Sequence, residues 1–153
     1  MRNTDNDWNL IAESEPYYGV LSEERFLGAK LTPDNKKNFF LSGERDIAHI
    51  RNVMASMGGQ LPRSGLDFGC GVARLLIPMS RIVEQSYGVD IADGMRNLAQ
   101  ENLQKAGLKN YSLSATIPEV RVNWVLPTFS WVKQWQEKRT FAAREFWGLQ
   151  RKQ

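Results

Sequence analysis

Residues 66–75, LDFGCGVARL, place Asp67 within a short apolar run and follow it with glycines at 69 and 71 before the sequence becomes amphipathic. This pattern predicts a strand that passes directly into a helix. At such a turn the first backbone N–H groups of the helix have no partner inside the helix, so the site favours anionic or polar ligands. Glycines there let a ligand lie against the main chain, because a Cβ atom would occupy the ligand's space.

The spacing of the glycines argues against two common nucleotide ligands. The dinucleotide fingerprint G-x-G-x-x-G/A, counted from Gly69, needs Gly or Ala at position 74, where this chain has Arg74. A phosphate-binding P-loop needs a lysine followed by Ser or Thr after the glycines, and no such lysine follows here. The sequence therefore disfavours dinucleotides and nucleoside triphosphates.

A second acidic residue lies at a distance typical of ribose recognition. YGVDIADGM, residues 87–95, predicts a strand that ends in Asp90, 23 positions beyond Asp67. In nucleotide-binding folds an acid at the tip of the second strand, about 20 residues on, reaches the ribose hydroxyls. The two motifs together indicate a nucleotide-like ligand.

The run D-x-G-C-G-x-A at 67–73 resembles the first motif of the class I S-adenosylmethionine-dependent methyltransferases. The resemblance extends to 87–95, and the N-terminal DWNLIAESEPYYGVL at 7–21 resembles the segment before the core in one branch of small-molecule methyltransferases, where it often forms a lid. It covers about residues 7–118, roughly three quarters of the chain. Ala73 stands where the family pattern has its third glycine.

This resemblance implies S-adenosylmethionine as the cofactor and methyl transfer to a small-molecule acceptor as the activity. It places the glycine loop around the methionine part of the cofactor, the acid after the second strand on the ribose, the next residue beside the adenine, and two tyrosines over the site. The cofactor-binding residues that it implies are Asp67, Gly69, Cys70, Gly71, Ala73, Asp90, Ile91, Tyr17 and Tyr18.

Strand-like and helix-like segments alternate after Ser64 with short links, which indicates a parallel sheet with right-handed crossovers. Pro78 is expected to kink the first of the helices. Gly107 is expected to cap the second. The strands are expected around 66–68, at 86–91, 110–115 and 120–126, and the helices at 71–81, 93–106 and 128–149.

The first 63 residues predict short helices. Asp5 or Asn6 is expected to cap a helix that Pro16 ends, and Ser42 to open a helix at 43–57. The buried face of the second helix is predicted from three-and-four spacing at Ile47, Ile50, Val53, Met54 and Met57. We expect three parts: an N-terminal helical lid at 1–63, the cofactor-binding core at 64–118, and a divergent tail at 119–153.

The fold class expected from these patterns and from the resemblance is α/β, a three-layer Rossmann-like methyltransferase sheet with an N-terminal helical lid. The third strand lacks the acid that often follows it in the family, and we find no F-D-x-V strand or later strands of the seven-stranded sheet. We therefore expect a chain that is truncated or frame-altered after about residue 118. An open sheet edge or the tail would then favour self-association.

Composition narrows the class of protein further. The chain has 153 residues, a net charge of +3, one cysteine and one histidine, which disfavours a disulfide framework and a protein-only metal site. It has no apolar run long enough for a membrane span and no signal-peptide pattern, so a cytoplasmic protein is expected. Residues 117–153 carry seven Lys or Arg against three Glu, yet tryptophan and phenylalanine at helical spacing favour packing over nucleic-acid binding.

Alternative roles remain open for several residues. Cys70 could be a nucleophile at a helix N-terminus, although the sequence places no histidine beside it. His49 fits a surface position better than a general base, and Tyr17 and Tyr18 fit core packing as well as a site role. No catalytic residue is assigned, because methyl transfer from a sulfonium proceeds largely through proximity and alignment. The alternative function is a non-catalytic cofactor-binding or oligomerisation module derived from a methyltransferase.

Overall fold

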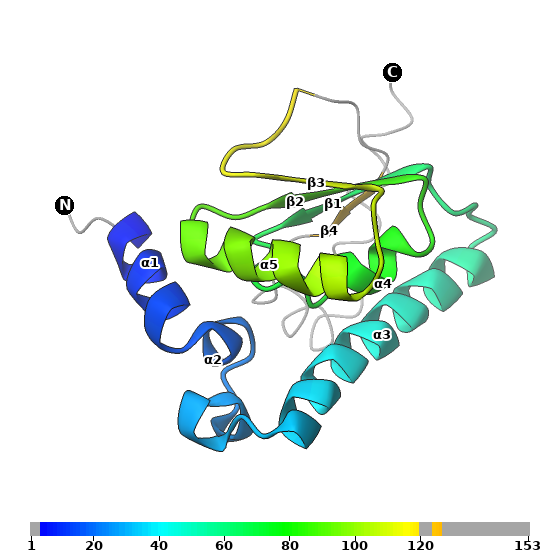
Figure 1. The fold of residues 1–153 in the computed structure, drawn as a ribbon. Helices are drawn as coiled ribbons and strands as arrows, with labels where there is room; N and C mark the ends of the chain where they lie inside the picture. Colours follow the sequence, from blue (N-terminus) through cyan, green and yellow to red (C-terminus); the bar gives the residue numbers. More distant parts are fainter. Residues whose placement is uncertain (1–3, 120–123, 127–153) are drawn as a thin grey trace.

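The structure is a computed structural model that describes residues 4–119 and 124–126 (Figure 1). Helices dominate the N-terminal half, and strands alternate with helices after Ser64. The helices are α1 (Thr4–Ser14), α2 (Pro16–Val20), α3 (Pro33–Ser56), α4 (Leu76–Ser80) and α5 (Asp93–Lys105), with short 3-10 helices at Glu24–Phe26 and Gly28–Lys30. The strands are β1 (Ser64–Phe68), β2 (Gln85–Val89), β3 (Tyr111–Ser114) and β4 (Trp124–Leu126).

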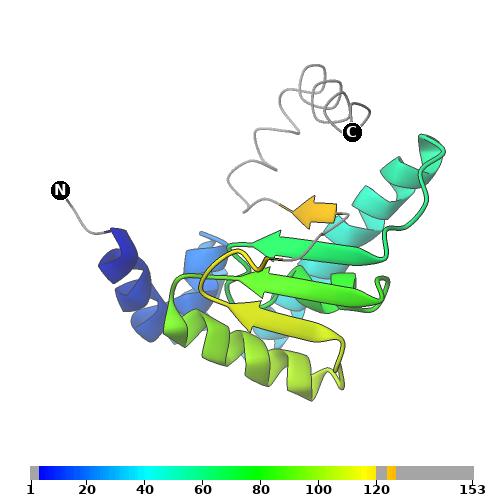
Figure 2. The ribbon, with the colours of Figure 1, turned by 90° about the horizontal axis from the view of Figure 1, so that it is seen from above.

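The four described strands form one parallel sheet in the order β3-β2-β1-β4. Figure 2 shows the strands pointing the same way, with their carboxyl ends toward α1. Helices α3, α4 and α5 lie on one face of this sheet (Figures 1 and 2). The expected α/β Rossmann-like fold is confirmed, and the described residues form two of the three layers, the sheet and one helical layer.

Two groups of buried side chains hold these layers together. The first lies between the sheet and the helices α3, α4 and α5, and the second joins the N-terminal helices to the carboxyl edge of the sheet. The first consists of Ile47, Cys70, Ala73, Leu75, Leu76, Ile77, Met79, Val83, Ala99 and Leu103. The second consists of Ala12, Tyr17, Leu21, Phe26, Phe39, Val72, Ala92 and Met95.

The helix after β1 is shorter than the sequence pattern predicts. Turns occupy residues 71–75, and α4 runs only over Leu76–Ser80 instead of 71–81. Pro78 therefore lies in the first turn of α4, where its missing N–H removes no bond within that helix, and the predicted kink is wrong. The positive backbone φ angles described below explain why the helix begins late.

The long helix α3 begins ten residues before the predicted helix. Thr32 is its N-cap, with the Oγ1 atom accepting the N–H of Asn35 at 3.2 Å, and Pro33 occupies the first turn. Ser42 does not open a helix, since its hydroxyl donates to the carbonyl of Phe39. The predicted buried face is also only partly correct: Ile47 is buried, whereas Val53 and Met57 near the C-terminal end are exposed.

Of the remaining predicted helices, one differs from the structure at its start and the other agrees with it. Helix α1 begins at Thr4, so Asp5 and Asn6 lie inside it and are not the cap, while Pro16 begins α2. Helix α5 agrees with the predicted 93–106. Gly107 has φ +73° and its N–H bonds the carbonyl of Gln104, which ends α5 as predicted.

The C-terminal predictions are tested only in part. Residues 124–126 form β4 within the predicted strand at 120–126, and the predicted helix at 128–149 lies outside the described residues. In the described part of the chain, no helix is long and apolar enough to cross a membrane.

Candidate functional site

The loop between β1 and α4 has an unusual backbone. Gly69, Gly71 and Ala73 have φ angles of +74°, +51° and +70°. The amide groups of Gly69 and Cys70 both donate to the carbonyl of Val89 at the end of β2, at 2.7 and 2.9 Å. The loop therefore turns sharply over the carboxyl ends of β1 and β2, and this left-handed backbone explains the glycine pattern of the sequence.

Asp90 lies directly beyond the end of β2 and bonds to the glycine loop. Its Oδ2 atom accepts the N–H of Gly71 at 2.9 Å, and its Oδ1 atom accepts the N–H of Ala92 at 3.0 Å. The second bond closes a turn between residue i and residue i+2, which aspartate favours. The guanidinium of Arg96 donates to the carbonyls of Asp90 and Ile91 and fixes the same turn from α5.

Asp67 is the most strongly perturbed acid of the site. It is 2% exposed, at the fourth position of β1, and faces the start of α4. Burial raises the pKa of Asp67 to about 7, because the ionised form loses its hydration. The positive charge of Arg74 opposes this rise in pKa, the negative charge of Asp90 adds to it, and the backbone N–H of Leu76 lowers the pKa.

The two acids are close enough for their charges to interact, and both lie at the carboxyl edge of the sheet. In parallel α/β sheets ligands bind in the crevice outside these ends. The structure thus brings together Asp67, the glycine loop and Asp90, three parts that the sequence analysis proposed as one site.

The N-terminal helices cover this edge. An added Cβ atom on Gly71 would lie 2.4 Å from Cγ2 of Val20, so at position 71 the packing of α2, and not a ligand, accounts for the glycine. Helix α1 packs against α5, where Gly94 lies close to Ala12. The segment before the core therefore lies over the loop, and its role as a lid stays a prediction.

The two tyrosines of α2 occupy different environments. Tyr17 is 5% exposed, and its ring packs edge-on against Phe39 and Phe40, with centroids 5.1 and 6.2 Å apart. Its hydroxyl is buried and has no hydrogen-bond partner among the described residues. Tyr18 is exposed. Packing thus accounts for Tyr17, and a role over the cofactor stays a prediction for both residues.

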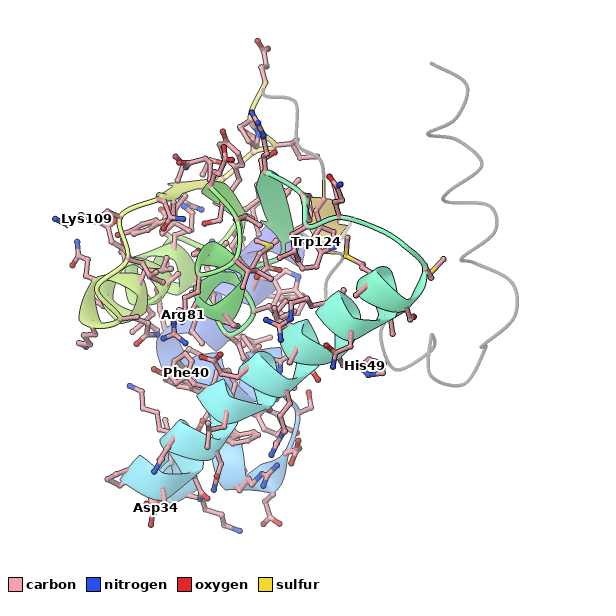
Figure 3. All side chains as sticks on the ribbon, turned by 90° about the vertical axis from the view of Figure 1, so that its right-hand side faces the viewer. Asp34, Phe40, His49, Arg81, Lys109 and Trp124 are labelled. Atoms are coloured by element: carbon pink, nitrogen blue, oxygen red, sulfur yellow. The ribbon has the colours of Figure 1, made fainter. Side chains whose placement is uncertain are left out.

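Three further residues are placed by the structure. The thiol of Cys70 is buried under β2, close to Gly88, and burial raises its pKa well above the usual value, which contradicts the nucleophile alternative. Ile91 is 47% exposed, so an apolar side chain is available beside Asp90 for a ring to pack on. His49 lies on the outward side of α3, as Figure 3 shows.

Sequence reasoning missed the connection between the loop and α3. Arg74 is buried, and its Nη1 atom donates to Ser42 Oγ at 3.0 Å and to Asp46 Oδ2 at 2.7 Å. Gly43 of α3 lies against the carbonyl group of Arg74. In the sequence, Arg74 argues only against a dinucleotide. The one signal for its contact with α3 is that a charged residue stands at the start of an amphipathic segment.

The fold and the site have the arrangement of a nucleotide-binding α/β protein. A Rossmann-like parallel sheet carries a glycine loop after β1, an acid near the end of β1 and a second acid directly after β2. Residues 66–137 match the family described as the methyltransferase domain. A search of curated proteins gives no match. The family match over this part of the chain and the shared fold agree with the resemblance to the class I S-adenosylmethionine-dependent methyltransferases.

Two solved structures have a similar fold. One is magnesium protoporphyrin IX methyltransferase from Synechocystis PCC 6803 with bound S-adenosylmethionine, 16% identical over 83% of this chain, with a TM-score of 0.56. The other is phosphoethanolamine N-methyltransferase 1 from Haemonchus contortus in complex with phosphoethanolamine and S-adenosylhomocysteine, 14% identical over 80% of this chain, with a TM-score of 0.55. This chain spans 62% of the first protein's chain and 24% of the second's.

Proposed function

We propose that the chain binds S-adenosylmethionine at the carboxyl edge of β1 and β2 and transfers its methyl group to a small-molecule acceptor. The observation that carries the proposal is the arrangement of Asp67, Asp90 and the glycine loop at one edge of a parallel sheet. Two similar structures hold S-adenosylmethionine or S-adenosylhomocysteine, which supports the same ligand class here.

The chemistry of the residues fits this ligand. A carboxylate is the natural partner of an ammonium group, and Asp67 offers one at the end of β1. Each carboxylate oxygen of Asp90 accepts one backbone bond and keeps a further lone pair for a ribose hydroxyl. Ile91 supplies exposed apolar surface beside these groups for the adenine ring.

When bound, S-adenosylmethionine would supply an electrophilic methyl group. The residues of this chain would bind and orient it, and α1 and α2, which pack on α5 and on the loop, would shield it from water. A general base is needed only where the acceptor must lose a proton, and we assign none.

Calorimetric titration with S-adenosylhomocysteine tests the binding site. Replacing Asp90 with Ala should weaken binding by about 1–3 kcal/mol, roughly 5- to 150-fold, through loss of the ribose bonds. Glu101→Ala is the matched control, because Glu101 is an exposed acid further along α5 that pairs with Lys105 and contacts none of the proposed site residues. An unchanged affinity of Asp90→Ala would remove Asp90 from the proposed site.

A non-catalytic binding or oligomerisation module is the second candidate function. The observation that favours it is that the described residues supply four strands and one helical layer, with β4 at the edge of the sheet. A methyl-transfer assay against metabolite pools separates the two candidates once binding is established. Light scattering measures self-association through the edge or the tail, and cell fractionation tests the proposed cytoplasmic location.

A further inference from the structure

The guanidinium of Arg96 reaches from α5 back to the turn that follows β2. Its Nη1 atom donates to the carbonyl oxygens of Asp90 and Ile91, at 2.5 and 2.9 Å. Its Nη2 atom pairs with the carboxylate of Asp93, and 20% of the Arg96 side chain is exposed. A planar guanidinium that bonds two consecutive carbonyls fixes the main chain between them, because its donors have a rigid geometry. Arg96 therefore holds the backbone of two predicted cofactor-binding residues.

The local sequence of α5 gives no separate reason for an arginine at this place. Position 96 lies near the amino end of α5, where the helix dipole disfavours a positive charge. The N-cap residue Ala92 makes no side-chain bond and Gly94 is the second residue of the helix, so this end is weakly stabilised by its own residues. An ion pair with an acid as exposed as Asp93 also contributes little. The main contribution of Arg96 is therefore to the turn.

The polar groups of Asp90 are all held by hydrogen bonds. Its N–H donates to the carbonyl of Ser114 in β3 at 3.1 Å, and its carboxylate accepts the N–H groups of Gly71 and Ala92. Its carbonyl accepts the guanidinium of Arg96, and of these partners Arg96 alone bonds through its side chain. A substitution at position 96 can therefore remove one support of Asp90 while the main-chain bonds remain.

The direction of the Asp90 carboxylate depends on this backbone. Figure 2 shows that α5 begins at the carboxyl edge of the sheet, so Arg96 lies on the element that borders the proposed ribose site. A group that already has its bound orientation loses less conformational freedom when a ligand binds. Loss of the two carbonyl bonds should widen the range of orientations of the carboxylate and weaken binding of a ribose.

We propose that Arg96 is a positioning residue of the cofactor site: its bonds to the carbonyls of Asp90 and Ile91 hold the Asp90 carboxylate in the orientation that accepts the ribose hydroxyls. The inference rests on the proposed function, because the ribose belongs to the proposed cofactor. It assigns to Arg96 an effect on the adenosine half of that ligand and none on the amino-acid half, for which Asp67 is the proposed partner.

Titration calorimetry with two ligands tests this role. S-adenosylhomocysteine carries both halves, whereas methylthioadenosine keeps the ribose and the adenine but lacks the amino-acid group. Arg96→Met removes the donors and keeps a long apolar stem, so it should weaken binding of both ligands by the same factor, about tenfold. Lys105→Met is the matched control, since it removes a cation of the same helix that pairs with Glu101, and it should change neither affinity by more than about twofold.

A double-mutant cycle with Asp90 separates positioning from a general loss of structure. In an Asp90→Ala background no carboxylate remains to be oriented, so Arg96→Met should change the affinity for S-adenosylhomocysteine by less than about threefold. Arg96→Lys keeps the charge but offers a single ammonium group to the two carbonyls, so it should lose less affinity than Arg96→Met. It replaces Arg96→Met in the cycle if that variant does not fold, which urea denaturation of each variant decides.

The outcomes differ for the two proposals. An unchanged affinity of Arg96→Met, a loss that is as large in the Asp90→Ala background, or a loss confined to S-adenosylhomocysteine overturns the positioning role and leaves the proposed function intact. If the wild-type protein does not bind S-adenosylhomocysteine, the proposed function itself fails, and the positioning role fails with it.

Discussion

Gly71 and Asp90 are joined across the carboxyl edge of the sheet by a hydrogen bond of 2.9 Å from the amide N–H of the first to Oδ2 of the second. The carboxylate that is proposed to hold the ribose therefore also fixes the backbone of the glycine loop. Loss of Asp90 should consequently affect the empty protein as well as ligand binding.

Asp90→Ala should lower the free energy of unfolding by about 2 kcal/mol, because hydrogen bonds to a charged group contribute about 1.5–3 kcal/mol each and this side chain is only partly buried. Urea denaturation measures the change. Asp90→Asn retains one good acceptor and should lose less than the alanine variant. Equal stability of the wild-type and alanine proteins would show that the two backbone bonds contribute nothing to the fold.

Gly71→Ala should destabilise the protein by about 2–4 kcal/mol, through a left-handed φ of +51° and through contact with Val20. In a Val20→Ala background the same change should be less harmful, since Cγ2 is then absent. A double-mutant cycle by urea denaturation gives the coupling energy between the two positions. A coupling near zero contradicts the packing of α2 on the loop.

Two substitutions of Ala73 should separate the contributions of backbone strain and of core packing to the stability of the fold. Ala73 is fully buried with φ +70°, so a β-branched replacement meets both a disfavoured backbone and a filled core. Ala73→Val should reduce the free energy of unfolding by more than 2 kcal/mol, roughly the sum of the strain and overpacking costs. Ala73→Gly relieves the strain but loses a buried methyl group, and its stability should stay within about 1 kcal/mol of the wild type. Thermal melting of both variants tests whether Ala73→Val loses more stability than Ala73→Gly.

Asp67 should make the folded protein less stable as the pH rises from 4 to 8. Its pKa is about 7 when folded and 3.8 when unfolded, so between these values the folded state binds the extra proton and stability decreases with pH. The full contribution is about 4 kcal/mol at most. Asp67→Asn should abolish this part of the pH dependence and weaken binding of S-adenosylhomocysteine. The urea midpoints of the wild-type and Asp67→Asn proteins, measured from pH 4 to 8, give the difference in stability. Midpoints that change with pH in parallel would contradict the expected contribution of Asp67.

The alternation of strands and helices after Ser64 could be predicted because each element has its own local signal. The glycines at 69 and 71 marked the loop, Asp90 followed a recognisable strand, and Gly107 ended α5 as predicted. These features depend on residues close together in the sequence. The strand predicted around 66–68 is β1, which begins two residues earlier, at Ser64.

The start of α3 could not be placed, because Thr32 and Pro33 are a good cap and first turn but no clear apolar periodicity follows until Phe39. The contact of Gly43 with Arg74 and the position of Val20 over the loop depend on tertiary packing between segments about 30 and 50 residues apart. A pattern within one segment carries no information about which distant backbone will lie against it.

The burial of Asp67 makes the free protein a proton acceptor near neutral pH. A cationic ligand that selects the carboxylate must release that proton to the solvent, and the buffer absorbs it with its own heat of ionisation. Titrations in phosphate and in Tris should therefore give different apparent enthalpies for the same association, and their difference counts the protons set free.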